Sequence, residues 1–182
     1  MKEEIKYVDS RTSEERANDP TSATTTDSIP TPQPKREKKR GYYGVAFFEP
    51  KFEENIGTAV RNAHCFGADF IAVIGKRYKK QPSDTMATER HVPIYEYADL
   101  DDFLNHIPLG CEIVVVECDG ENSVEFKHPQ RAIYLLGGED RNAPQISNTK
   151  RVKFPTSHCV NMAVASGLIL YDRIIKSNLP TH

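Results

Sequence analysis

The chain has 182 residues and a formal net charge of −2, which suits one domain of ordinary size with an additional tail. This charge excludes nucleic-acid binding driven by net charge alone, so any basic surface must be local. No apolar run reaches the ~20 residues of a membrane span, and the N-terminal MKEEIKYVDS lacks the apolar core of a secretory signal, so we expect a soluble cytoplasmic protein with no membrane partner.

Residues 1–40 contain no Leu or Phe and centre on a stretch rich in Thr, Ser and Pro. Such a segment cannot bury enough apolar area to offset its ordering entropy, so we predict a disordered tail followed by a folded domain at 41–178. The tail closes with a basic cluster, Lys35–Arg40. This cluster is either a solvated hinge or an electrostatic contact to phosphates, which salt would weaken.

The first predicted elements are a strand at Tyr42–Phe48, rich in aromatic residues, and a helix at Glu53–Gly67. The helix starts with two acidic residues and ends at a glycine, as its dipole and a C-terminal cap favour. Arg61 lies about 160° from the centre of the apolar face, so it is either a solvated arginine or one directed at a phosphate or cleft. Asn55 suits an N-cap. The apolar face comprises Ile56, Ala59, Val60, Ala63 and Phe66.

A basic loop follows the next predicted strand, Phe70–Gly75, whose uniform apolarity is typical of a parallel sheet covered on both faces. Cations around one tyrosine suit a nucleic-acid backbone and a stacked base, and a solvated loop is the alternative. The stretch 81–91 is predicted as a loop with a helical turn. The basic residues of the loop are Lys76, Arg77, Lys79 and Lys80.

The remaining segments alternate between short β-branched runs and helical patterns, with a polar loop at 119–129. This alternation predicts an α/β fold with a mostly parallel sheet and helices on both faces. Further strands are predicted at Ile94–Tyr97, Glu112–Glu117, Ile133–Leu136 and Arg151–Phe154, and helices at Asp99–Ile107 and Val160–Ile175.

The last predicted helix is apolar on nearly every side, and such a helix is buried on more than one side. Its small residues permit another backbone to approach closely. The helix therefore suits either a homodimer interface or the wall of an enclosed ligand site. We expect its core stripe to comprise Val160, Ala163, Val164, Gly167, Leu168, Tyr171, Ile174 and Ile175.

The four cysteines, at 65, 111, 118 and 159, form no C-x-x-C pair, and three lie in apolar runs. We therefore expect buried reduced thiols rather than a disulfide or a zinc site. The six histidines lack metal-ligand spacing with a partner, so no metal is expected. No nucleophile–base pair, G-x-G-x-x-G or Walker A sequence is present.

A double glycine ends the apolar run that starts at Arg131, in the order Gly137, Gly138, Glu139. Glycines at the end of a strand let a ligand approach the backbone. Ligands of parallel α/β sheets collect at the carboxyl ends of the strands. The sequence therefore predicts a ligand site at this loop.

Three motifs occur in order along the chain. N-x-G-x-x-x-R-x-A-x-x-F-G covers Asn55–Gly67, G-x-E-x-x-G starts at Gly137 with Asn142 in its last position, and S-L-N-x-x-x-A starts at Cys159. With these motifs, residues 42–176 resemble the SpoU (TrmH-type) branch of the SPOUT RNA methyltransferases. The resemblance implies an α/β fold with a deep trefoil knot in its C-terminal part, a homodimer, and S-adenosylmethionine as cofactor.

The same resemblance implies methylation of a ribose 2′-hydroxyl in tRNA or rRNA. Arg61 would bind the adjacent phosphate and stabilise the developing alkoxide, Asn55 and Glu139 would support the catalytic centre, and Asn161 would order the pocket wall. The basic loop and the tail would contact RNA. The implied cofactor-binding residues are Leu135, Leu136, Gly137, Gly138, Val152, Phe154, Val160 and Met162.

Two other functions stay open. The departures at Asn142 and Cys159 allow a catalytically weak SPOUT-fold protein that binds RNA or cofactor without turnover. Outside the family, an α/β interaction module would bind no S-adenosylmethionine.

Overall fold

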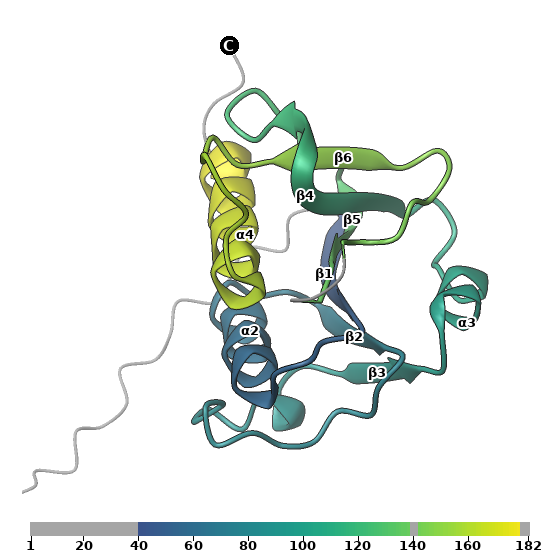
Figure 1. The fold of residues 1–182 in the computed structure, drawn as a ribbon, viewed down its shortest axis with the longest axis vertical. Coiled ribbons are helices and arrows are strands. Elements are labelled where there is room, and N and C mark those ends of the chain that lie inside the picture. The colour runs from purple at the N-terminus through teal and green to yellow at the C-terminus, as the bar shows by residue number, and fades with distance from the viewer. Residues whose placement is uncertain (1–39, 139–141, 179–182) are drawn as a thin grey trace, which may run out of the picture. The chain divides into compact units, whose positions relative to one another are not determined.

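A computed structural model describes residues 40–138 and 142–178. The predicted tail, apart from Arg40, and the predicted catalytic Glu139 lie outside the described residues. The described residues form a six-stranded sheet in the order β3-β2-β1-β5-β4-β6 (Figure 1). Within these residues, no helix is long and apolar enough to cross a membrane.

The strands follow the predicted apolar runs, and every pairing among the described residues is parallel. The mostly parallel α/β fold is therefore confirmed, while the trefoil knot stays a prediction. Central β1 pairs with β2 on one side and β5 on the other, so the direction of strand addition reverses there. The strands are β1 (Tyr42–Phe48), β2 (Phe70–Ile74), β3 (Ile94–Tyr97), β4 (Glu112–Asn122), β5 (Arg131–Leu136) and β6 (Lys150–Lys153).

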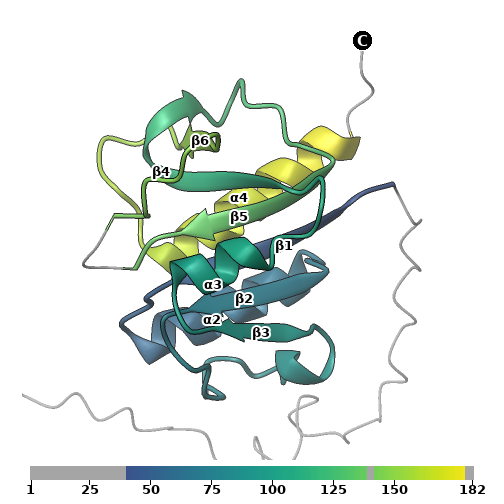
Figure 2. The same cartoon turned by 90° about the vertical axis from the view of Figure 1, so that its right-hand side faces the viewer.

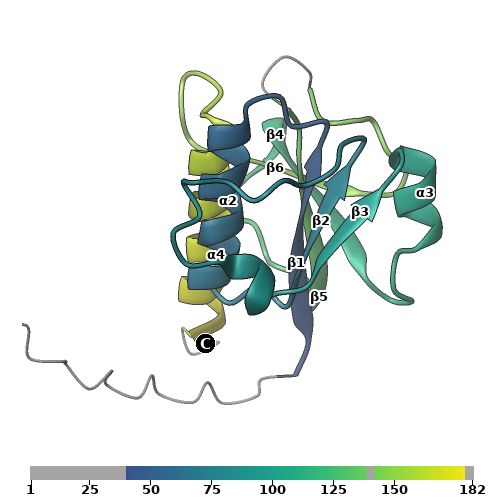
Figure 3. The ribbon, with the colours of Figure 1, turned by 90° about the horizontal axis from the view of Figure 1, so that it is seen from below.

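Helices cover both faces of the sheet, as predicted. Helices α2 (Glu53–Cys65) and α4 (Met162–Asn178) lie side by side on one face, and α3 (Leu100–Asn105) lies on the other (Figures 2 and 3). The helical turn expected in the loop 81–91 is the 3-10 helix η2 (Thr88–Arg90).

Side chains of each strand alternate between two cores, because successive residues of a strand point to opposite faces. Val45 and Phe47 of β1 join the core beneath α2 and α4, whereas Ala46 joins the core beneath α3. All three side chains are fully buried. This burial on both faces explains why the strand sequences are uniformly apolar.

The predicted loop 119–129 is partly wrong, because β4 continues to Asn122. Its pairing with β6 is interrupted after Val116 and resumes at Glu121, and both of these residues pair with Val152. The chain therefore bulges between the two paired stretches and brings polar residues into a strand. Composition alone favoured a loop there because the added pairing depends on a distant strand.

The predicted face of α4 is also partly wrong. Ala163 of the expected stripe is buried, but Val164, Leu168, Tyr171 and Ile175 are exposed, with Val164 at 52% and Tyr171 at 56%. Met162, Ala165 and Ile169, which do not belong to that stripe, are buried instead. A helix that is apolar all round carries no polar face to set its rotation, so the sequence did not determine which side packs inward.

The N-terminus of α2 differs from expectation in one detail. Its N-cap is Phe52, which makes no side-chain capping hydrogen bond, and Asn55 lies in the first turn. The predicted apolar face is otherwise confirmed, since Ile56, Ala59 and Val60 are buried.

A polar cluster holds the C-terminal half of α4 to β5 and to the loop before it. His128 joins the hydroxyl of Tyr134 through Nδ1 (2.7 Å) and a carboxylate oxygen of Asp172 through Nε2 (2.9 Å). Arg173 donates to the same Tyr134 hydroxyl, and Lys176 donates to Asp172. A neutral imidazole satisfies this network, with Nδ1 accepting from Tyr134 and Nε2–H donating to Asp172.

Burial lowers the pKa of His128, and the hydrogen bond that its ring donates to Asp172 only partly offsets this. Burial also raises the pKa of Tyr134 to about 12, although Arg173 acts in the opposite direction. Both groups are therefore neutral near pH 7. The cluster fixes where α4 lies on the sheet, and hence where its N-terminus points.

Candidate functional site

The candidate site lies where the carboxyl ends of β1, β4, β5 and β6 meet. The loop after β5 crosses close to the loop after β1, since a Cβ on Gly138 would lie 2.5 Å from the carbonyl oxygen of Glu49. Only glycine allows the two backbones to approach this closely. The predicted ligand loop is thus at the expected edge of the sheet.

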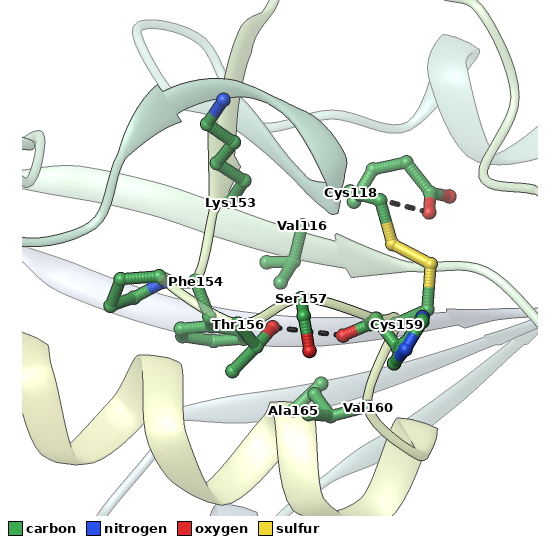
Figure 4. A pocket seen from close by; sticks show the side chains of 12 residues that line it. Val116, Cys118, Lys153, Phe154, Thr156, Ser157, Cys159, Val160 and Ala165 are labelled. Carbon is green, nitrogen blue, oxygen red and sulfur yellow. Dashed lines mark hydrogen bonds between the residues drawn. A yellow bond between two sulfur atoms is a disulfide. The ribbon is translucent and has the colours of Figure 1, made fainter.

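A cavity of about 440 Å³ lies between β4, the segment after β6 and the start of α4 (Figure 4). Its size falls within the range of small-molecule sites, about 300–1,000 Å³. Its walls combine apolar side chains with the polar segment between β6 and α4. It is lined by Val116, Glu117, Cys118, Lys153, Phe154, Pro155, Thr156, Ser157, His158, Cys159, Val160 and Ala165.

The predicted cofactor residues divide into two groups around this cavity. Phe154 and Val160 line it directly. The other six do not line it: the strand and helix residues among them are buried in the two cores, and the two glycines are half-buried. The buried residues are Leu135, Leu136, Val152 and Met162, and the glycines are Gly137 and Gly138.

Asn161 fixes the start of α4 at the cavity. Its side-chain oxygen accepts a hydrogen bond from the backbone N–H of Ala163 (2.8 Å), and its carbonyl accepts from Ala165 (2.8 Å). The first bond satisfies an N–H group that the first turn of a helix leaves unpaired, and the second is the first regular hydrogen bond of α4. An ordering role for Asn161 in the pocket wall fits this geometry.

Glu117 links the opposite wall to the segment after β5. One carboxylate oxygen accepts from the backbone N–H of Cys118 (3.0 Å) and the other accepts from that of Ala143 (2.8 Å). Across the cavity, the hydroxyl of Thr156 donates to the carbonyl of His158 (2.8 Å) and stiffens the last loop (Figure 4).

The expectation of buried reduced thiols is wrong, because two of the four cysteines form a disulfide and none of the four is buried. Cys118 and Cys159 form a disulfide with a Cα–Cα distance of 5.7 Å, and both are exposed at the cavity rim (Figure 4). Of the free thiols, Cys65 is exposed and Cys111 is half-buried. The pair lies 41 residues apart in sequence, with Cys118 in β4 and Cys159 in the segment before α4, so local apolarity gave no sign of it.

Arg61 projects from the exposed side of α2, as the helix periodicity predicts. Its neighbour Asn62 donates to the carbonyl of Ala163 (2.8 Å) and to the hydroxyl of Ser166 (3.1 Å). These contacts join the helix that carries Arg61 to the first turns of α4, where the cavity begins. Arg61 and the cavity are therefore held by the same pair of helices.

The stretch that follows the basic loop packs along the N-terminal half of α2. Gly57 permits this, because a Cβ there would overlap the hydroxyl of Ser83, which itself donates to the carbonyl of Glu54 (3.1 Å). Lys76 donates to the carbonyl of Lys51, and Lys80 forms an ion pair with Glu89 (3.2 Å). The four predicted RNA-binding cations, Lys76, Arg77, Lys79 and Lys80, are all exposed.

Tyr78 does not provide the free stacking ring that the loop composition suggested. Its ring packs against the core beneath α2 and α4, and burial raises the pKa of its hydroxyl to about 12. Its backbone N–H donates to Glu96 (2.8 Å). The tyrosine therefore anchors the loop, and the cations around it remain at the surface.

Several cavity residues were missed by the sequence interpretation. Glu117 and Cys118 lie in β4 where its pairing with β6 is interrupted, Lys153 ends β6, and Thr156–His158 belong to the polar segment before α4. The only signal that they gave was their position after predicted strands, the edge where ligands of parallel sheets bind.

Comparison with known proteins agrees with the motifs. A model described as the SpoU rRNA Methylase family matches residues 43–171, more than half of the chain. No curated protein sequence gives a significant match.

Several solved structures share the fold. A protein studied for 2-OH methylation of C/U34 on tRNA has 20% identity and a TM-score of 0.66, over 76% of this chain and 98% of that one. The SpoU methyltransferase AviRb from Streptomyces viridochromogenes, in complex with AdoMet, has 20% identity and a TM-score of 0.65. That match covers 85% of this chain and 62% of AviRb, so this chain spans less than two thirds of that protein.

The A. aeolicus TrmH/SpoU tRNA modifying enzyme has 22% identity and a TM-score of 0.64, over 78% of this chain and 79% of that one. At these identities the likeness concerns the fold.

Proposed function

Because the chain belongs to the SpoU rRNA methylase family, we propose that it transfers a methyl group from S-adenosylmethionine to a ribose 2′-hydroxyl of tRNA or rRNA. The observation that carries this proposal is the cavity at the carboxyl edge of the sheet, joined through Asn62 to the helix that presents Arg61. RNA substrates of this kind make the cytoplasm its proposed location.

The cavity fits the cofactor in size and in lining. Apolar side chains at Val116, Phe154 and Val160 suit the faces of an adenine ring, and the backbone of the segment between β6 and α4 offers hydrogen-bonding groups. Gly137 and Gly138 leave the backbone after β5 open to close approach. When bound, S-adenosylmethionine supplies an electrophilic methyl group on its sulfonium.

Arg61 and the basic loop supply the RNA side of the proposed site. A planar guanidinium binds a phosphate through two parallel hydrogen bonds, and the exposed cations of the loop at 76–80 add further positive charge for the RNA backbone. Phosphate contacts of this type position RNA without reading its sequence. The net charge of −2 is compatible with this arrangement, because the cations are gathered locally.

The chemical step requires the 2′-oxygen to be aligned with the methyl group and to lose its proton. We assign Arg61 to holding the phosphate beside that ribose and to stabilising the negative charge that develops on the oxygen. A guanidinium stays protonated in proteins, so Arg61 does not act as the base. Asn55 and Glu139 are proposed to support the catalytic centre, and most of the rate gain comes from positioning.

A homodimer is part of the proposal. Val164, Leu168, Tyr171 and Ile175 follow one another at intervals of four, three and four residues, which places them on one side of α4. All four are exposed apolar side chains. An apolar stripe of this kind at the surface of a single chain is typical of a protein interface, and a second copy can bury it symmetrically.

The test is methyl transfer from tritiated S-adenosylmethionine to total tRNA and to rRNA, with calorimetry of cofactor binding in parallel. We expect label in dinucleotides that resist alkali, because a methylated 2′-oxygen cannot attack the neighbouring phosphate. Cofactor binding without transfer to either RNA would instead support the weak RNA-binding protein that Asn142 and Cys159 suggest. Absence of cofactor binding would reject both.

A further inference from the structure

The disulfide between Cys118 and Cys159 joins two walls of the candidate cofactor cavity. Cys118 follows the buried part of β4, and Cys159 lies two residues before Asn161, the residue that caps α4. Both cysteines line the cavity (Figure 4). Their Cα–Cα distance of 5.7 Å lies in the usual range for disulfides, about 4.4–6.8 Å, so the backbones already stand where the bond needs them.

We propose that Cys118 and Cys159 form a reversible redox switch that governs access to this cavity. The proposal rests on the proposed function, because it takes the cavity to be the S-adenosylmethionine site. In the oxidised form the two walls are linked covalently at the rim. In the reduced form the wall before α4 is free to move and admit the cofactor.

The segment that carries Cys159 has little else to hold it. Among the described residues, the hydrogen bonds of the segment 155–160 are local. The N–H of Thr156 donates to the carbonyl of Phe154, and the Thr156 hydroxyl donates to the carbonyl of His158. Residues 155–159 are all exposed. Val160 at the end of this segment packs against the core beneath α2 and α4, and within the exposed part, 155–159, the disulfide is the main tie to the rest of the site.

Exposure makes the bond accessible to other thiols. Thiol–disulfide exchange requires a thiolate to reach one of the two sulfur atoms, and exposed disulfides are the labile ones. The loop that the bond closes spans 41 residues and lies at a cavity rim rather than in a core. These features favour a disulfide that forms and breaks under cellular conditions over a permanent structural disulfide.

A low-molecular-weight disulfide such as glutathione disulfide is the oxidant that forms the Cys118–Cys159 bond. The thiolate of one cysteine attacks the small disulfide, forms a mixed disulfide and releases one small thiol. The second cysteine then attacks the mixed disulfide, and the Cys118–Cys159 bond forms as the second small thiol leaves. Two electrons and two protons pass from the protein to the oxidant, and excess small thiol reverses both steps.

A metal site is the competing interpretation of the same residues. The donor atoms of Glu117, Cys118 and Cys159 lie within 4.8 Å of one another, a set that Zn²⁺ accepts when the thiols are reduced. However, both oxygens of Glu117 already accept backbone hydrogen bonds, from Cys118 and Ala143. The sulfur atoms are joined to each other, so we favour the redox switch.

The experiment equilibrates the full chain in glutathione buffers of different oxidation state. Cys118–Cys159 bonding is read by alkylation and mass spectrometry, and S-adenosylmethionine affinity by calorimetry. We expect oxidised protein to bind at least about tenfold more weakly than reduced protein, a difference of about 1.4 kcal/mol. In a Cys118→Ser/Cys159→Ser variant the affinity should be the same in both buffers. Cys65→Ser, which removes an exposed unpaired thiol, should keep the wild-type response.

Three results would overturn the switch. The first is equal affinity in oxidised and reduced protein with the disulfide shown to form. The second is a pair that never oxidises, or that oxidises only after a chelator removes zinc. The third is no binding in either state, which would reject the proposed cofactor site as well; the first result leaves that site intact.

Discussion

Helices α2 and α4 lie side by side on the same face of the sheet, yet their sequences constrain them very differently (Figure 1). In α2 one face is apolar and buried and the other is polar, so its rotation follows from its periodicity alone. In α4 apolar residues occur on nearly every side, and four of them remain exposed.

This difference explains why α2 and α4 contribute differently to the proposed site. The polar face of α2 presents Arg61 at the surface, where our proposal has it contact RNA. In α4 the rotation is set by specific polar contacts, with Asn62 and Asn161 at one end and the cluster around His128 at the other. The exposed apolar side of α4 is left for a second copy in our proposal.

The largest expected effect comes from the polar face of α2. Arg61→Lys should reduce methyl transfer by about 10²–10³-fold, because a lysine cannot form the paired hydrogen bonds that hold a phosphate and its neighbouring charge. Affinity for S-adenosylmethionine, measured by calorimetry, should not change. Arg131→Lys, at the amino end of β5, is the matched control. Near-normal turnover in Arg61→Lys would show that the bidentate role is wrong.

The exposed side of α4 is tested by Leu168→Asp. If this side forms a homodimer, a buried charge there should cost about 2 kcal/mol or more, at least roughly thirtyfold in the dimer Kd, as measured by analytical ultracentrifugation. Leu109→Asp changes a leucine that is 97% exposed and lies outside α4, and should leave association unaltered. Equal effects of the two substitutions would contradict an interface on α4.

The contact between the helices is tested by Asn62→Ala. The substitution removes hydrogen bonds to Ala163 and Ser166 and leaves a buried hydroxyl with one partner fewer, so we expect a loss of about 1–3 kcal/mol in the free energy of unfolding. Urea denaturation measures this loss. Asn105→Ala, at the exposed end of α3, should change stability far less. Comparable losses would mean that the helices are held by apolar packing alone.

The smallest expected effect is a pH dependence from the cluster that anchors α4. Burial lowers the pKa of His128 in the folded protein, so the unfolded chain binds the proton more readily than the folded one. The contribution of His128 to stability is then complete above its usual pKa of about 6.5 and is lost as pH falls through the lower folded value.

Denaturation at pH 7.5 and at successively lower pH should therefore show falling stability in the wild type. In His128→Gln this part of the decline should be absent, because the amide does not titrate. The groups that face His128, namely Tyr134, Asp172, Arg173 and Lys176, are unchanged in the variant. A decline of the same size in both proteins would assign the effect to other groups.

The sequence predicted most of the elements because their signals are local. β1 and β3 have the predicted bounds, and the outward position of Arg61 follows from its place on an amphipathic helix. The three motifs identified the family, which the match over residues 43–171 confirms. The loop assigned to 119–129 failed, since its first residues pair with β6, about 30 residues further along the chain.

Periodicity and composition thus determined the strands, the buried face of α2 and the edge of the sheet where a ligand would bind. Tertiary structure alone decided which side of α4 is buried, that Tyr78 serves as an anchor, and that Cys118 meets Cys159. The physical reason is the range of the interactions. A helix or strand pattern reports which residues avoid water, whereas a contact between distant segments depends on how the chain returns to itself.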